Sequence, residues 1–95
     1  MRQIEAQLSK NAIKVESGKG KMLAQWQKTG GFDGAIEDFN SLYLNDVRVA
    51  ENGTKIGKYG DNITINVRPF SSQGSATLEI INDTTKRRIK YRYIE

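Results

Sequence analysis

Three stretches in the last third of the chain alternate between apolar and polar residues, which is the pattern of half-buried β-strands. They are Ile63–Arg68, Ala76–Ile81 and Arg88–Tyr93, and polar segments separate them. Successive side chains of a strand point to opposite faces, so the pattern predicts a twisted antiparallel sheet with one apolar face. The apolar face collects Ile63, Ile65, Val67, Leu78, Ile80, Ile89, Tyr91 and Tyr93. The other, solvent-facing side collects Thr64, Asn66, Arg68, Thr77, Glu79, Arg88, Lys90 and Arg92.

A hairpin is predicted just upstream of these strands. Val47–Ala50 and Thr54–Lys58 flank the dipeptide Asn52-Gly53, which is typical of a two-residue type I′ turn with positive φ at both positions. Gly57, within the returning strand, indicates a bulge or a close approach to the backbone.

The first part of the chain has helical spacing. Residues 2–16 predict a helix docked on the sheet, with residues 1–20 as that helix or a linker. Lys21–Thr29 is predicted as a second short helix with Trp26 on its apolar side. We interpret Trp26, the only tryptophan, as a core anchor; the alternative is a platform on which a nucleic-acid base stacks.

A third helix is predicted with Asp33 as its N-cap. Its apolar side would consist of Ile36, Phe39, Leu42 and Tyr43. Glu37 and Asp38 are expected to face water, where a favourable interaction with the helix dipole explains them. Helices in residues 21–45, followed by an antiparallel sheet in residues 46–95, predict a single α+β domain.

Composition narrows the possible chemistry. Cysteine and histidine are both absent, which excludes disulfides, a thiolate nucleophile, Cys-based zinc sites and His-dependent triads. The acidic residues are scattered over separate elements, so we expect no metal site and no cofactor. No stretch approaches the roughly 20 apolar residues of a membrane-spanning helix.

Positive charge is concentrated near the end of the chain. The net charge is +4, and five of the seven residues from Lys86 to Arg92 are basic. Such a cluster suits RNA, DNA or an acidic protein partner. The alternative is a solvated strand that its charge keeps soluble.

The candidate site lies on the polar side of the predicted sheet. Its residues are Arg68, Ser72, Thr77, Glu79, Lys90 and Arg92. RNA cleavage by attack of the 2′-hydroxyl needs cations aimed at the charge that develops on phosphorus, a base for that hydroxyl and an acid for the leaving oxygen. Arg68, Lys90 and Arg92 would hold the phosphate, because guanidinium forks and ammonium groups pair with its oxygens.

The remaining candidates would complete this chemistry. Glu79 is the candidate base, and Ser72 or Thr77 would hydrogen-bond the phosphate or the ribose. In the alternative interpretation, Glu79 and its cationic neighbours are ordinary cross-strand ion pairs, each contributing about 0.2–1 kcal/mol.

The order and spacing of several motifs resemble the C-terminal toxin modules of bacterial polymorphic toxins, including contact-dependent growth inhibition effectors. The resemblance covers residues 26–93. The motifs that carry it are Gly31-Phe32, Asp38-Phe39, Leu42, Ile65-Asn66-Val67-Arg68-Pro69, Ser71-Ser72, Gly74, Thr77-Leu78-Glu79-Ile80 and Arg88-Ile89-Lys90-x-Arg92-Tyr93.

This resemblance implies the barnase/EndoU/colicin/RelE-like fold, in which N-terminal helices pack on a twisted antiparallel sheet. It also implies ribonuclease activity, with tRNA as the expected substrate, and neutralisation by a cognate, often acidic, immunity protein. Such a domain would be secreted or delivered from the cell surface within a larger effector and would act in the cytoplasm of the target bacterium. The chain is thus expected to be a metal-independent ribonuclease toxin domain.

Two other functions remain open at this point. A non-catalytic nucleic-acid-binding module would use the same face, with an affinity that falls steeply with salt. A protein-interaction domain would instead pair its basic sheet edge with a strand of an acidic partner.

Overall fold

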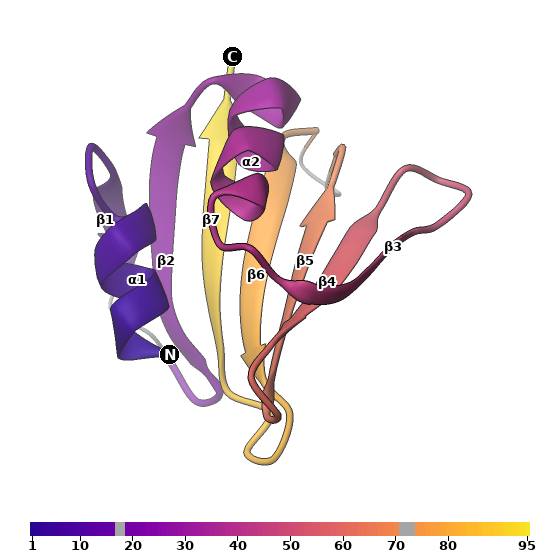
Figure 1. The fold of residues 1–95 in the computed structure, drawn as a ribbon. Coiled ribbons are helices and arrows are strands. Elements are labelled where there is room, and N and C mark those ends of the chain that lie inside the picture. Colours follow the sequence, from indigo (N-terminus) through magenta and orange to yellow (C-terminus); the bar gives the residue numbers. More distant parts are fainter. Residues whose placement is uncertain (17–18, 71–73) are drawn as a thin grey trace.

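The computed structural model describes residues 1–16, 19–70 and 74–95, and these residues form an α+β fold (Figure 1). Two helices, α1 (Arg2–Leu8) and α2 (Gly31–Asn40), pack on a seven-stranded, mostly antiparallel open sheet. The strands are β1 (Ile13–Glu16), β2 (Met22–Thr29), β3 (Asn45–Val49), β4 (Lys55–Tyr59), β5 (Ile63–Arg68), β6 (Ala76–Asn82) and β7 (Arg88–Ile94). The predicted fold class is confirmed, and the three C-terminal strands lie within one residue of their predicted bounds.

The strand order in space is β1-β2-β7-β6-β5-β4-β3. Strands β2 and β7 run parallel, with Trp26 beside Tyr91, whereas the other neighbouring pairs are antiparallel. The last strand therefore lies between an N-terminal hairpin, β1–β2, and the four strands that precede it in sequence.

The core fills the space between the sheet and the two helices, which lie on the same side of the sheet (Figure 1). The larger sheet residues of the core are at most 2% exposed: Ile65, Val67, Leu78, Ile80, Ile89, Tyr91 and Tyr93. From the helices, Ile4, Leu8 and Phe39 pack against them. The apolar face predicted from alternation is confirmed, with Ile63 partly buried at its margin.

The single helix predicted for residues 2–16 is wrong beyond Leu8. Ile4 and Leu8 occupy the predicted buried stripe, but the helix ends there and Asn11 takes a left-handed conformation with φ of 61°. The chain then forms β1, in which Val15 is exposed. After Leu8, backbone pairing with β2 replaces the hydrogen bonds of the helix.

The helix predicted for Lys21–Thr29 is also wrong, because this segment forms strand β2. Its backbone pairs with β1 on one side and β7 on the other. Lys28 occupies an inward position like Trp26 and interrupts the apolar alternation. Its Nζ is satisfied by the Leu8 carbonyl at 2.8 Å and the Asp38 carboxylate at 2.6 Å.

Helix α2 differs from its prediction at three points. It begins at Gly31 after an N-cap at Gly30, so Asp33 lies in its first turn instead of capping it. Tyr43 lies beyond the helix and is 89% exposed. Asp38 faces the sheet, not water, because it accepts hydrogen bonds from Lys28 and, at 2.7 Å, from the Tyr93 hydroxyl.

The β3–β4 hairpin has a longer loop than the type I′ prediction. Only Gly53 has positive φ, at 89°, and Asn52 does not. The Ala50 N–H donates to the Thr54 carbonyl, and the Gly53 N–H donates to the Ala50 carbonyl, as in a three-residue loop with glycine at its left-handed position. The close approach predicted at Gly57 is confirmed, since a Cβ there would lie 2.9 Å from Leu44.

Candidate functional site

The sheet face opposite the helices, called the open face below, brings the candidate residues together. In this face, Arg68, Thr77 and Arg92 form one row across β5, β6 and β7. The adjacent row consists of Asn66, Glu79 and Lys90. Arg88 follows on β7, two residues before Lys90. Five of the six candidates therefore occupy neighbouring positions on three strands, and Ser72 lies outside the described residues.

Glu79 is the buried centre of the open face. Its side chain is 7% exposed, and each carboxylate oxygen pairs with a different guanidinium. Arg68 Nη2 lies 2.9 Å from Oε1, and Arg88 Nη1 lies 3.4 Å from Oε2. Two opposite charges and their hydrogen bonds thus compensate the cost of desolvating this carboxylate.

Arg88 is the partner that sequence reasoning did not include in the site. It is not opposite Glu79 in the ladder, because that position belongs to Lys90. It reaches the carboxylate along the diagonal between neighbouring strands, a contact that long side chains make. The alternation of apolar and polar residues places Arg88 on this face. Its contact with Glu79 could therefore have been predicted from the diagonal contacts that long side chains make between neighbouring strands.

Lys90 and Arg92 add positive charge that the described residues do not neutralise. Within the described part of the chain, neither has an ion-pair partner within 4 Å. Three buried atoms of the open face also lack a hydrogen-bond partner there: Asn66 Oδ1, Arg68 Nε and Arg92 Nε. Four cations thus surround one carboxylate, an arrangement that favours binding of an anion.

Thr77 is placed differently from its predicted role. It is fully buried, and its hydroxyl donates to the Ser75 carbonyl at 3.3 Å. A buried hydroxyl that already has a partner does not reach a phosphate or ribose at the surface. Thr77 therefore belongs to the packing of β6, although it lies in the row between Arg68 and Arg92.

The open face continues toward the β3 edge of the sheet. A hollow of about 290 Å³ there is lined by Asp46, Arg48, Ile56, Gly57 and Lys58. Lys58 is held by Asp83 at 2.9 Å and by Thr64 at 2.7 Å. The hydrogen bonds from Lys58 and Thr64 lower the pKa of Asp83 below its ordinary value. Because Lys58 is engaged in this cluster, Arg48 is the cation that this hollow adds to the face.

The acidic residues do not gather in the described ranges. In residues 1–16, 19–70 and 74–95, no three carboxylates come together in a way that would hold a metal ion. In the same ranges, no helix is both long enough and apolar enough to cross a membrane.

Comparisons with known proteins do not assign this chain to a family. No family model, curated protein or solved structure matches it. The resemblance to toxin modules therefore rests on the motifs in the sequence alone.

Proposed function

We propose that the open face binds the phosphate backbone of RNA and that the chain acts as a ribonuclease toxin domain. One observation carries the binding step: Lys90 and Arg92 have no ion-pair partner in the described residues and lie beside the Glu79 cluster. Phosphates would neutralise this excess charge and release condensed counterions. Neither helix obstructs the face (Figure 1).

Cleavage would use the ribose 2′-hydroxyl as the nucleophile. Its oxygen attacks the adjacent phosphorus, the 5′ oxygen of the next nucleotide leaves with a proton, and a 2′,3′-cyclic phosphate remains. Lys90 and Arg92 would stabilise the charge that develops on the phosphate oxygens. The reaction needs no further reactant, and the resemblance to toxin modules favours tRNA as the RNA and an acidic immunity protein as the inhibitor.

The two ion pairs of Glu79 set a condition on its role as the base in RNA cleavage. Both of its oxygens are engaged, so one ion pair has to open before the carboxylate accepts a proton from the 2′-hydroxyl. A phosphate that draws Arg68 or Arg88 toward itself would free that oxygen. Until then, Glu79 acts as a positioning residue that fixes the two guanidinium groups.

The burial of Glu79 also favours a second candidate function, RNA binding without cleavage. If both ion pairs persist in the complex, the Glu79 carboxylate is not free to act as a base. The face would then hold the RNA backbone only, and the RNA would remain intact.

The test separates binding from turnover. Purified protein is incubated with total bacterial RNA in the presence of EDTA, and the products are separated on a denaturing gel. Wild type is expected to yield discrete tRNA-sized fragments, whereas Arg92→Ala yields none. Lys10→Ala, which removes an exposed charge outside the open face, is the matched control and should behave as wild type.

Binding is measured on the same variants by titration at several salt concentrations. Arg92→Ala should reduce the slope of log affinity against log salt by about 1, the change expected for one lost phosphate contact. Salt-dependent binding without fragments would establish the second candidate function. Neither binding nor fragments from wild type would contradict both.

A further inference from the structure

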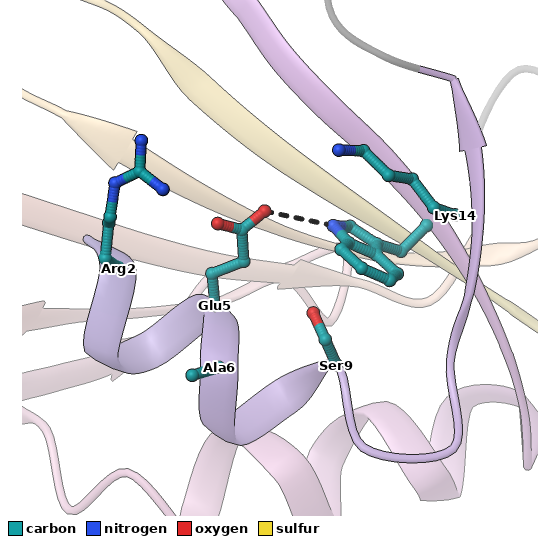
Figure 2. Close-up of a pocket in the computed structure, with 6 residues that line it drawn as sticks. Arg2, Glu5, Ala6, Ser9 and Lys14 are labelled. Atoms are coloured by element: carbon teal, nitrogen blue, oxygen red, sulfur yellow. Dashed lines mark hydrogen bonds between the residues drawn. The ribbon is translucent and has the colours of Figure 1, made fainter.

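A pocket of about 440 Å³ lies on the other side of the sheet, beside α1 and the β1–β2 hairpin (Figure 2). It is lined by Arg2, Glu5, Ala6, Ser9, Lys14 and Trp26. Trp26 alternates with Gln25 and Gln27 along β2 and contacts the core residue Tyr91, so its ring faces away from the open face. The volume falls in the range of small-molecule sites, roughly 300–1,000 Å³.

The indole of Trp26 is held in place on several sides. It stacks on the buried ring of Tyr91, with centroids 6.2 Å apart and planes at 13°. Its Nε1–H donates to Glu5 Oε2 at 3.2 Å, and Lys14 Nζ lies 5.7 Å from the ring centroid. Trp26 thus packs against the core, as predicted, and remains partly exposed at the pocket. A fixed aromatic surface loses little entropy when a planar ligand stacks on it.

Three charged side chains line the pocket without pairing with one another. Figure 2 shows Glu5 between Arg2 and Lys14, and none of the three belongs to an ion pair in the described residues. A second hollow of about 240 Å³ shares the same three residues. The carboxylate of Glu5 keeps lone pairs beyond the one that the indole uses. The pocket therefore offers an acceptor in the middle and cations on both sides.

We propose that this pocket binds a nucleotide whose base carries an exocyclic amino group. The base would stack on Trp26, its amino group would donate to Glu5, and its phosphate would lie near Arg2 and Lys14. Carboxylates accept hydrogen bonds from the amino group of cytosine, whereas uracil presents a carbonyl oxygen at the same place and would face the carboxylate unfavourably. The nucleotide would be either free or part of an RNA strand.

This site does not rest on ribonuclease activity of the open face, because the two lie on opposite sides of the sheet. The test uses CMP and UMP, which present an amino group and a carbonyl oxygen, respectively, at the same ring position. Trp26 is the only tryptophan, so its fluorescence and its single indole N–H resonance report on this pocket alone. CMP should perturb both signals saturably and bind roughly tenfold more tightly than UMP, as one hydrogen bond to a charged acceptor allows.

Single substitutions test which side chain makes each proposed contact with the nucleotide. Glu5→Gln keeps an acceptor for the indole N–H but removes the charge, and it should abolish the preference for CMP over UMP. Lys14→Ala, on the exposed edge strand, should weaken both nucleotides by the same factor. Lys10→Ala lies outside the pocket lining and should change neither affinity. Circular dichroism identifies any variant that fails to fold.

The proposal is overturned if CMP gives no saturable change, or if CMP and UMP bind equally to wild type. A full preference for CMP in Glu5→Gln would overturn the role of the carboxylate. A short oligodeoxycytidylate, which lacks the 2′-hydroxyl needed for cleavage, identifies the source of the ligand. If the oligonucleotide binds more tightly than CMP, the pocket binds a nucleic-acid strand. If the two bind equally, the pocket binds a free nucleotide.

Discussion

Leu78 and Glu79 are neighbours in strand β6 and are both buried, but by different means. Leu78 is covered by apolar side chains between the sheet and the helices. Glu79 is paired with Arg68 and Arg88, whose side chains remain 39% and 42% exposed. The apolar side chains of the core need no other partner than one another. On the charged side, Lys90 and Arg92 have no ion-pair partner in the described residues. The helix side thus holds the apolar core, and the open face retains positive charge that the described residues do not neutralise.

The largest expected effect is on the helix side. Leu78→Ala should lower the free energy of unfolding by about 2–5 kcal/mol, because it removes fully buried methyl groups and leaves a cavity. Urea denaturation followed by circular dichroism measures the loss. RNA affinity of the molecules that remain folded should not change. A loss below about 1 kcal/mol would mean that the core collapses around the site.

Alkaline pH provides a second test of the helix side, with a smaller effect. Burial raises the pKa of Tyr91 from 10.0 to about 12. A folded-state pKa above the unfolded value means that this stability is complete below pH 10 and is lost as the pH rises toward 12. The shift corresponds to about 3 kcal/mol. Denaturation midpoints should therefore fall over this interval, and more steeply in wild type than in Tyr91→Phe, which has no phenol there to ionise.

The smallest expected effect on stability is on the open face. Arg88→Ala should change the free energy of unfolding by about 0–1 kcal/mol, because its guanidinium is substantially solvated and Arg68 still pairs with Glu79. Under the proposed function, RNA affinity should nevertheless fall, because the open face loses one of its cations. Thermal unfolding and salt-dependent RNA titration on the same sample test both parts. A large loss of stability would show that the open face contributes to folding as much as the core does.

The C-terminal strands were predictable because the pattern of residues within each strand is enough to indicate its conformation. Apolar and polar residues alternate from Ile63 to Arg68, from Ala76 to Ile80 and from Arg88 to Tyr93, so the two faces of these strands follow from the pattern. Strand β2 was not predictable in this way, because inward Lys28 masks the alternation. Its partner β7 lies far along the chain, and this distant pairing decides its conformation.

The details of the open face were predictable only in part. Alternation placed Arg68, Lys90 and Arg92 on it, but did not indicate that Glu79 is shared between two arginines. It also did not indicate that Thr77 is buried, since alternation gives the face on which a residue lies but not its exposure. Pairing and burial of polar groups thus required the structure.

The position of β7 also has a consequence for how the chain acquires its fold. This strand joins the β1–β2 hairpin to β6, so the two parts of the sheet remain separate until Arg88–Ile94 has left the ribosome. Contacts of such large sequence separation give a high contact order, and domains dominated by them fold on the millisecond-to-second timescale. Folding of this domain is therefore expected to follow synthesis of its last strand instead of proceeding stepwise during translation.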